Sequence, residues 1–346
     1  MLREQYNSVF SKPNENFRVE DPALFFSFED DDEILTNISF DKEDIIDQID
    51  SLSSNAAAGP DGVPAILLKK CKRSIVDGLE ILFRKFLKDG DLPHLMKLAF
   101  VIPVHKGGSR GEPVNFRPVS LTSHLMKTLE RVIRKVVVNH LEVHKKLNPN
   151  QHGFRFQRSC LSQLLDHHDK VLQFLEDGNN VDTVYLDFSK AFDKVDIGIL
   201  SHKLRDIGLT GNLGIFLHNF LSNREQHIIA NGVKSTPSKV LSGVPQGTVL
   251  GPILFLIMIN DIDKNSSAEI SLFCDDTRIM KPIKTENDVE DLQEELEKLY
   301  IWETENNMKF NGKKFELLRF GKNSNLKEDT NYFTQGWTKS LKRKKS

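Results

Sequence analysis

The amino-acid sequence predicts an α+β fold in which an antiparallel sheet is covered by helices. An apolar strand over 181–188 is followed by helical periodicity, and a nearly all-apolar helix over 249–262 precedes a hairpin over 270–280. Strands that alternate with long helices are typical of this class. With 346 residues, of which 39% are hydrophobic and 28% are charged, the chain can bury a large core in two lobes.

The first half of the chain is predicted to be mainly helical. Apolar residues recur there at helical spacing, and a loop rich in Ala and Gly interrupts them. The expected elements are a helix over 41–52, a basic helix over 64–87, a strand over 99–104 and an amphipathic basic helix over 121–141.

The second half is predicted to mix strands with helices. Gly208 and Gly211 are weak points in its first helical stretch. The expected elements are a strand over 181–188, helix over 197–221, strands over 226–230 and 239–241, a buried helix over 249–262, the hairpin over 270–280, an amphipathic helix over 288–302, and strands over 308–311 and 315–320.

Charge is distributed unevenly along the chain, although the net charge is only −2. Residues 1–50 hold 14 acidic and 4 basic residues, whereas residues 65–160 hold 19 Lys and Arg against 7 Asp and Glu. We therefore expect an acidic leader over 1–40 and a basic tail over 323–346. A basic lobe is typical of a protein that binds a phosphate backbone, but a solvated helix face explains such a run equally well.

The sequence gives no sign of a membrane segment or a disulfide framework. Its longest uncharged apolar run, 249–259, is much shorter than the roughly 20 residues that span a bilayer. The N-terminus has no apolar signal-peptide region. Cys71, Cys160 and Cys274 are far apart and form no C-x-x-C unit, so we expect a reduced, intracellular protein without a zinc site.

Two adjacent carboxylates, Asp275 and Asp276, are predicted at the tip of the hairpin. A tight two-residue turn aims neighbouring side chains toward one point, which a single strand does not do. Their repulsion and lost solvation are costly unless a cation neutralises them, and aspartate oxygens are hard ligands suited to Mg²⁺. Taken alone, such a pair is more often only a solvated surface turn.

Asp187 is a third candidate, because it ends the strand predicted over 181–188. A strand end beside a hairpin tip would bring three carboxylates together in one sheet. Such a group can hold two Mg²⁺ ions roughly 3.5–4 Å apart, which clamp the attacking and leaving oxygens of an in-line displacement. Taken alone, Asp187 is as well suited to cap a following helix.

Seven motifs follow one another along the chain. The first three are GPDG at 59–62, FRPVSLT at 116–122 and QHGFR at 151–155. The other four are DFSKAFDKV at 187–195, SGVPQGTVLGP at 242–252, FCDDT at 273–277 and NGKK at 311–314. In this order they resemble three fingers motifs and four palm motifs of reverse transcriptases of non-LTR retrotransposons, in particular the jockey-like group. The resemblance implies a right-hand polymerase with fingers over 41–180, a palm over 181–322 and an absent or truncated thumb.

The resemblance also implies a metal site. Asp187, Asp275 and, more peripherally, Asp276 would bind two Mg²⁺ ions, or Mn²⁺ in their place, and the Phe188 carbonyl would complete one coordination shell. One ion would lower the pKa of the primer 3′-hydroxyl, and the other would neutralise the leaving pyrophosphate. Lys314 would be a general acid for pyrophosphate, although an exposed lysine without a catalytic role fits as well.

Four further residues are implied in binding the triphosphate. Lys190 and Ala191 would offer backbone N–H groups to its oxygens. Lys106 and Arg117 would contact it from the fingers, where the fork of the Arg guanidinium suits phosphate oxygens.

Phe192 and Gln246 are implied in selecting the incoming nucleotide. Phe192 matches the family's steric gate, a ring beneath the sugar that leaves no room for a 2′-hydroxyl. A phenylalanine of the core is the alternative interpretation. Gln246 would touch the nucleotide from a Gly-rich turn that allows close backbone approach.

The chain departs from the family pattern at several places. Cys274 stands where the family usually has Ala, and we expect retained activity with sensitivity to thiol oxidation. Phe315 stands where a Cys usually follows the motif lysine. The chain also ends about 25 residues after Phe320, so we expect the thumb and endonuclease parts of the element to lie outside it.

The implied function is RNA-directed DNA polymerisation, with an RNA template, a DNA primer and dNTPs as partners and no membrane association. The expected location is the nucleus, at the site of integration. One alternative is a thumbless remnant that binds nucleic acid without extending it. An RNA-templated RNA polymerase is disfavoured by Phe192, and a domesticated protein with a structural or regulatory role is a further alternative.

Overall fold

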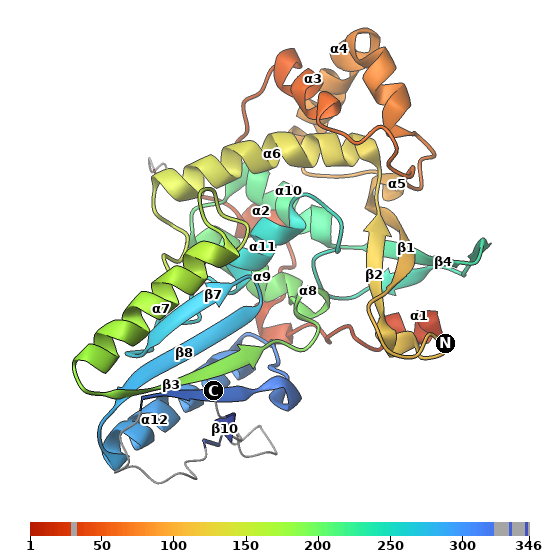
Figure 1. The fold of residues 1–346 in the computed structure, drawn as a ribbon. Coiled ribbons are helices and arrows are strands. Elements are labelled where there is room, and N and C mark those ends of the chain that lie inside the picture. Colours follow the sequence, from red (N-terminus) through yellow and green to blue (C-terminus); the bar gives the residue numbers. More distant parts are fainter. Residues whose placement is uncertain (29–32, 322–331, 334–342, 345–346) are drawn as a thin grey trace. The chain divides into compact units, whose positions relative to one another are not determined.

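The computed structural model describes residues 1–28, 33–321, 332–333 and 343–344 (Figure 1). They form two compact units, the first from 1–146 and 192–258 and the second from 147–191 and 259–346. Each unit carries a five-stranded sheet with helices, so the predicted α+β class is confirmed. The boundaries of the leader, fingers, palm and tail stay predictions, and most of the tail lies outside the described residues.

The first unit contains a mixed sheet of order β2-β1-β4-β5, in which β6 also pairs with β4. Its strands are β1 (Leu98–His105), β2 (Phe116–Leu121), β4 (Arg224–Ala230), β5 (Val233–Lys234) and β6 (Ser238–Val240). Its helices are α1 (Leu2–Asn7), η1 (Glu15–Phe17), α2 (Pro22–Phe25), α3 (Lys42–Asp50), α4 (Ala65–Asp89), α5 (His94–Lys97), η2 (Pro113–Asn115), α6 (His124–Val143), α9 (Ile197–Asp206), α10 (Gly211–Leu221) and α11 (Gly251–Met258).

The described N-terminal residues are part of the core of this unit. Tyr6 of α1 packs with Val101 and Ile228 of the sheet, and Phe26 is fully buried. Full burial of one large apolar side chain stabilises the folded state by about 1.5–3 kcal/mol. The predicted acidic leader therefore contributes packing as well as charge.

Part of the charge asymmetry is neutralised inside the first unit. The Asp44 carboxylate pairs with Lys135 of α6 at 2.8 Å, and Asp50 pairs with Lys72 of α4. Glu33 forms a similar pair with Lys146. The acidic N-terminal stretch and the basic helices thus satisfy one another in part, which lowers the net positive charge left on α4 and α6.

The predicted helix over 197–221 is divided into α9 and α10. The break occurs at Gly208, with φ 87°, and Gly211, with φ 55°, where side chains on other residues would be strained. A Cβ on Gly208 would also lie 2.7 Å from the Glu33 carbonyl oxygen. The two glycines therefore end one helix and begin the next.

The second unit contains a sheet of order β10-β9-β3-β8-β7. Its strands are β3 (Asn180–Asp187), β7 (Glu269–Phe273), β8 (Asp276–Ile283), β9 (Glu316–Phe320) and β10 (Arg343–Lys344). Its helices are α7 (Cys160–Glu176), α12 (Glu286–Glu305) and η3 (Gly312–Lys314), and the short α8 (Ala191–Lys194) begins at its boundary.

Helices α7 and α12 cover opposite faces of this sheet. Val181 of β3 packs with Val171 of α7, whereas the ring of Phe188 lies 6.0 Å from that of Trp302 of α12. Alternate residues of a strand point to opposite faces, so Asp187, six residues after Val181, points to the face that α7 covers. Figure 1 shows α7 running alongside β7, roughly in the direction of the strands.

Several elements were not anticipated, and one expected strand is reduced. Strand β2 and helix α7 had no counterpart among the predicted elements. The strand expected over 308–311 is a single bridge between Phe310 and Phe188. Among the described residues, no helix has both the length and the apolar character needed to cross a membrane.

Candidate active site

Three of the predicted carboxylates meet at one end of the sheet in the second unit. Strands β3 and β8 are antiparallel, and Asp187 is directly opposite Asp276 in their register. Directly opposite side chains of such a pair lie on the same face, with Cβ atoms about 4.5–5.5 Å apart. Asp275 precedes Asp276 in the turn. The strand ladder therefore sets Asp187 opposite Asp276 and beside the turn that contains Asp275.

The hairpin is confirmed, but its tip is one residue earlier than predicted. Phe273 pairs with Asp276, so Cys274 and Asp275 alone form the two-residue turn. Asp276 is instead the first residue of β8. The expectation that both aspartates occupy the tip is wrong, because the ladder between β7 and β8 continues up to Asp276. Asp275 is the more buried of the two, and Asp276 is exposed.

The environment of this cluster favours a cation. Burial raises the pKa of Asp275, and the charges of Asp276 and Asp187 raise it further while its backbone hydrogen bond opposes the rise. Burial also raises the pKa of Asp276, again with a contribution from Asp187. Carboxylates with raised pKa values are destabilised in their charged form, so a bound cation would lower the free energy of the site.

Lys314 supplies a positive charge to the cluster. Its Nζ forms an ion pair with Oδ2 of Asp187, and its side chain is 59% exposed. It lies on η3, whose position is fixed by the Asn311 N–H, which donates to the Asp187 carbonyl at 2.7 Å. Lys314 is thus next to the carboxylates, and its part as a general acid stays a prediction.

The backbone of Phe188 is oriented away from its bridge partner. The bridge to Phe310 uses the Ser189 N–H and the Asp187 carbonyl, each at 2.7 Å. In such a non-hydrogen-bonded pair, the carbonyl of the central residue points to the other side of the strand. The ring of Phe188 stacks on Phe310 with centroids 4.2 Å apart, which anchors the chain just after Asp187.

The donor set fits a divalent metal ion that also binds substrate. Within the ranges that the structure describes, no three His, Cys, Asp or Glu side chains are grouped closely enough to hold a metal ion by themselves. Mg²⁺ usually takes one or two protein carboxylates and completes its shell with water and substrate phosphates. Asp187, Asp275 and Asp276 supply carboxylates of that kind.

The thiol of Cys274 has a raised pKa. Burial, with the neighbouring charges of Asp275 and Asp276, raises this pKa to about 12. The thiolate is the species that oxidises readily, and a raised pKa disfavours it. The expected sensitivity to thiol oxidation stays a prediction.

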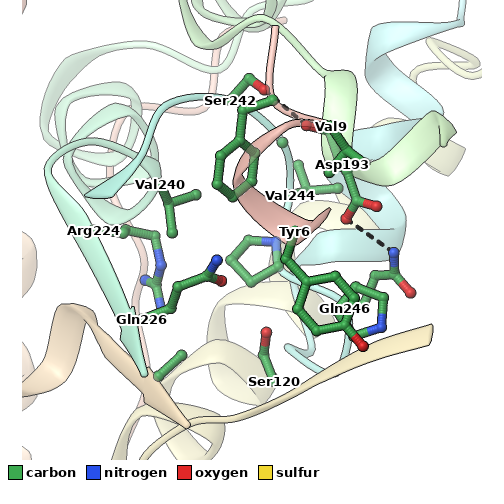
Figure 2. A pocket seen from close by; sticks show the side chains of 15 residues that line it. Tyr6, Val9, Ser120, Asp193, Arg224, Gln226, Val240, Ser242, Val244 and Gln246 are labelled. Carbon is green, nitrogen blue, oxygen red and sulfur yellow. Dashed lines mark hydrogen bonds between the residues drawn. The ribbon is translucent and has the colours of Figure 1, made fainter. Parts of the chain in front are cut away.

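In the first unit, Gln246 lies in a turn that packs tightly against strand β2 and the residues after Phe192. Its Nε2 donates to Oδ1 of Asp193 at 3.0 Å, as Figure 2 shows, and its carbonyl accepts from the Ser120 N–H at 2.7 Å. Gly247 has φ 110°, and a Cβ there would lie 2.7 Å from the Ser120 carbonyl oxygen. The turn does allow close backbone approach, and the backbone that approaches is that of β2.

Phe192 is a half-buried ring of the same unit. It stacks on Phe255 of α11 with centroids 4.5 Å apart and ring planes 17° apart. Its carbonyl accepts from the Val244 N–H at 2.8 Å. The ring therefore has one face in the core, and both the gate and the core interpretations keep a structural basis.

The remaining predicted contacts are on turns and strand ends. Lys106 follows β1, and its N–H donates to the Asn115 carbonyl at 2.9 Å. Arg117 is exposed on β2, opposite Val104. In the second unit, Lys190 has φ 57°, and Ala191 begins α8. These placements leave the proposed phosphate contacts as predictions.

Sequence reasoning did not single out two residues that contact predicted site residues or their neighbours, one in each unit. Asp193 holds the Gln246 side chain, and its position inside the DFSKAFDKV motif was the available signal. Gln151 contacts the turn at Cys274, 123 positions away. The motif around Gln151 was noticed, but nothing local indicates such a distant partner.

Among solved structures, a telomerase chain aligns with this chain. Apo telomerase from Candida tropicalis, truncated from its C-terminal domain, aligns with a TM-score of 0.47 and 12% identity. The alignment covers 72% of this chain and 56% of the telomerase chain.

Comparison with curated proteins finds polymerases of mobile elements. The RNA-directed DNA polymerase from mobile element jockey of Drosophila melanogaster is 27% identical over 288 residues, which cover 80% of this chain and 31% of the relative. The probable RNA-directed DNA polymerase from transposon BS of the same species is 29% identical over 221 residues, which cover 64% and 24%. The chain thus spans less than a third of the length of these relatives.

A family model matches most of the chain. The model described as reverse transcriptase (RNA-dependent DNA polymerase) aligns with residues 104–342. This range includes the carboxylates of the second unit and the Gln246 turn of the first. By this match, the chain belongs to the reverse transcriptase (RNA-dependent DNA polymerase) family.

Proposed function

We propose that this chain is the catalytic part of an RNA-directed DNA polymerase, which transfers nucleotides from dNTPs to a primer 3′-hydroxyl. The observation that carries the proposal is the register of β3 and β8, which sets Asp187 opposite Asp276 and beside the turn of Asp275. The raised pKa values of Asp275 and Asp276 support a site that gains stability from a cation.

The carboxylates and the Phe188 carbonyl are the proposed ligands of two Mg²⁺ ions, or of Mn²⁺. Bound there, divalent ions would lower the pKa of the primer 3′-hydroxyl and neutralise the charge of the pyrophosphate leaving group. Asp187 and Asp275 would be the main ligands, and the exposed Asp276 would tolerate change better. Lys314 would hold a proton at Nζ beside the leaving group once its ion pair with Asp187 opens.

The remaining residues would bind and select the nucleotide. Phe192, fixed on Phe255, would leave no room for a 2′-hydroxyl, and Gln246 would contact the nucleotide from its turn. Lys106 and Arg117 would bind the triphosphate through charge, together with the backbone N–H groups at Lys190 and Ala191. Catalysis would then consist mostly of positioning and electrostatic stabilisation.

Template and primer would be held mainly through their phosphates. Such binding is largely independent of sequence and weakens as salt concentration rises. The proposed partners are an RNA template and a DNA primer. The proposed place of action is the nucleus, at the site of integration.

The proposal is tested by extension of an oligo(dT) primer on poly(rA), with and without Mg²⁺. We expect Mg²⁺-dependent extension by the wild-type chain and, for Asp275→Asn, a loss of at least about 10³-fold, because a principal charged ligand is removed. Asp276→Asn should lose less.

Asp291→Asn is the matched control. Asp291 is an exposed aspartate of the same unit, paired with Lys281 on the protein surface, and its replacement should leave extension unchanged. A wild-type chain that binds template and primer but does not extend them would contradict the polymerase proposal. Full extension by Asp275→Asn would contradict the metal assignment.

A further inference from the structure

The QHGFR motif at 151–155 packs against the hairpin that carries Asp275. Gln151 forms an isolated parallel bridge with Leu272 of β7. The Leu272 N–H donates to the Asn150 carbonyl at 3.0 Å, and the His152 N–H donates to the Leu272 carbonyl at 2.8 Å. The motif, which resembles part of the fingers in sequence, therefore adds a short stretch of backbone to the edge of the second unit's sheet.

The amide of Gln151 binds the turn through both of its polar atoms. Its Oε1 accepts from the Cys274 N–H at 2.8 Å and from the Gly153 N–H at 2.7 Å. Its Nε2 donates to the Cys274 carbonyl at 3.3 Å. Gln151 is only 3% exposed, so water does not compete well for these bonds. One side chain thus satisfies both backbone groups of Cys274.

Cys274 needs such support because of its backbone conformation. It has φ 55°, in the left-handed region that side chains other than Gly rarely adopt. The same residue forms the turn with Asp275, so its conformation sets the direction in which Asp275 points. A turn that relaxed from this conformation would move the Asp275 carboxylate away from Asp187.

Gly153 closes the contact from the other side. A Cβ at this position would lie 2.4 Å from the Cys274 Sγ and 2.5 Å from the Cys274 nitrogen. Only a glycine lets the motif approach the turn this closely. Gln151 and Gly153 together therefore hold Cys274 from one side, through hydrogen bonds and through close packing.

We propose that Gln151 is a positioning residue, which holds the Cys274–Asp275 turn in its left-handed conformation and so aims Asp275 at the reacting centre. The catalytic consequence rests on the proposed polymerase function, whereas the hold on the turn does not. Among related side chains, only Gln fits. Asn carries the same amide but is too short, and Glu lacks the donor for the Cys274 carbonyl. Glu would also add a negative charge beside three carboxylates.

The hold on the turn is tested by hydrogen–deuterium exchange of the full chain. Gln151→Met keeps the length and burial of the side chain but removes all three hydrogen bonds. We expect exchange in peptides that cover 272–277 to accelerate about tenfold, because the Cys274 N–H loses its acceptor. Gln163→Met is the matched control, since Gln163 is a buried glutamine of the same unit at 1% exposure on α7.

Exchange results decide the proposal without any activity measurement. Unchanged exchange over 272–277 in Gln151→Met overturns it, and so does an equal acceleration in Gln163→Met. Acceleration in Gln151→Met alone supports it. A wild-type chain that extends no primer would contradict the proposed function and would leave this structural result standing.

Kinetics then test the positioning role. For Gln151→Met we expect kcat to fall on the order of 10²-fold, as misplacement of a reacting group by about 1 Å does, with KM for dTTP within about threefold. A fall in kcat/KM through KM alone would overturn the proposal, because Gln151 would then act in nucleotide binding.

A double-mutant cycle with Cys274→Gly adds a test that a purely structural role would not satisfy. Gly adopts the left-handed conformation without strain, so the turn should depend less on Gln151 in that background. We expect the loss of kcat caused by Gln151→Met to shrink at least about threefold when Cys274→Gly is present. Strictly multiplicative losses in the double variant would overturn the proposal.

Discussion

At the scale of single residues, Phe192 occupies a position determined by packing. One face of its ring lies on Phe255, which is fully buried in α11. The Val244 N–H donates to the Phe192 carbonyl at 2.8 Å, which fixes the backbone at Phe192. A ring held by both stacking and backbone cannot move aside easily, and this rigidity is what a steric gate requires.

Phe192→Val should therefore admit ribonucleotides. The shorter side chain opens space beneath the sugar, and we expect the ratio of kcat/KM for rTTP over dTTP to rise roughly 10- to 100-fold. The lost stacking should also lower the free energy of unfolding by about 1–2 kcal/mol. Single-nucleotide extension with each substrate measures the ratio, and Phe156→Val, at a residue 78% exposed, is the control. An unchanged ratio in Phe192→Val would place the gate elsewhere.

At the scale of elements, a buried ion pair joins β3 to β9. Asp182 and Arg319 are opposite each other in the register, and Arg319 Nε donates to Asp182 Oδ1 at 2.5 Å. The Tyr332 hydroxyl donates to Asp182 Oδ2 at 2.7 Å. Asp182 and Tyr332 have no exposed surface. This cluster ties β9 to the strand that ends in Asp187.

Removal of one charge from this cluster should be costly. Asp182→Asn removes the carboxylate that pairs with Arg319 while the guanidinium stays buried, and we expect the free energy of unfolding to fall by about 3–5 kcal/mol. The triple variant Asp182→Leu, Arg319→Met, Tyr332→Phe should recover most of that loss, because the three polar groups of this cluster are replaced together. Urea unfolding measures both, with the exposed Asp291→Asn as control. A loss below about 1 kcal/mol in Asp182→Asn would contradict the expectation.

At the scale of the whole molecule, each unit contains a buried histidine whose pKa is lowered far below the usual value. Burial, with smaller contributions from charged neighbours, lowers the pKa of His167 to about 4 in the second unit. Burial, together with the charge of Lys97, lowers the pKa of His218 to about 4 in the first unit. Unfolded histidine has a pKa near 6.5, so below that pH the unfolded chain binds protons that the folded chain does not.

Both units should therefore lose stability on acidification. The contribution of each buried neutral histidine to the free energy of unfolding is full above pH 6.5. It falls by about 3 kcal/mol for each histidine as the pH falls from about 6.5 to about 4. Thermal unfolding between pH 7 and pH 4.5 measures the loss. His167→Gln and His218→Gln should each flatten the dependence, whereas His168→Gln, at an exposed neighbour on α7, should not. Equal slopes in all variants would contradict this assignment.

Local patterns predicted much of the second unit. Alternation and the carboxylate positions placed the strand over 181–188 and the hairpin over 270–280, and the structure has β3, β7 and β8 there. Helix α7 was not predicted because several of its polar side chains are buried and several of its leucines are exposed. Gln163, His167 and Val171 are buried, whereas Leu161, Leu165 and Leu172 are exposed, so the apolar stripe does not mark the buried face.

Strand β2 was missed for a different reason. Pro118 lies within it, opposite Pro103 of β1, and proline weakens the prediction of a strand because it donates no ladder hydrogen bond. The structure resolves this by placing β2 at the edge of its sheet, where a strand needs donors on one side only.

The sequence by itself determined the chemistry of this protein: the three carboxylates, the turn glycines and the order of the family motifs. These follow from residue identity and short spacing, which the sequence contains in full. Only the tertiary structure decided that Asp276 belongs to a strand, that Cys274 is half-buried, and that Gln151 forms hydrogen bonds with the turn at Cys274. Each of these depends on register and on contacts between residues far apart in the chain, such as the 123 positions between Gln151 and Cys274, and no local pattern specifies such contacts.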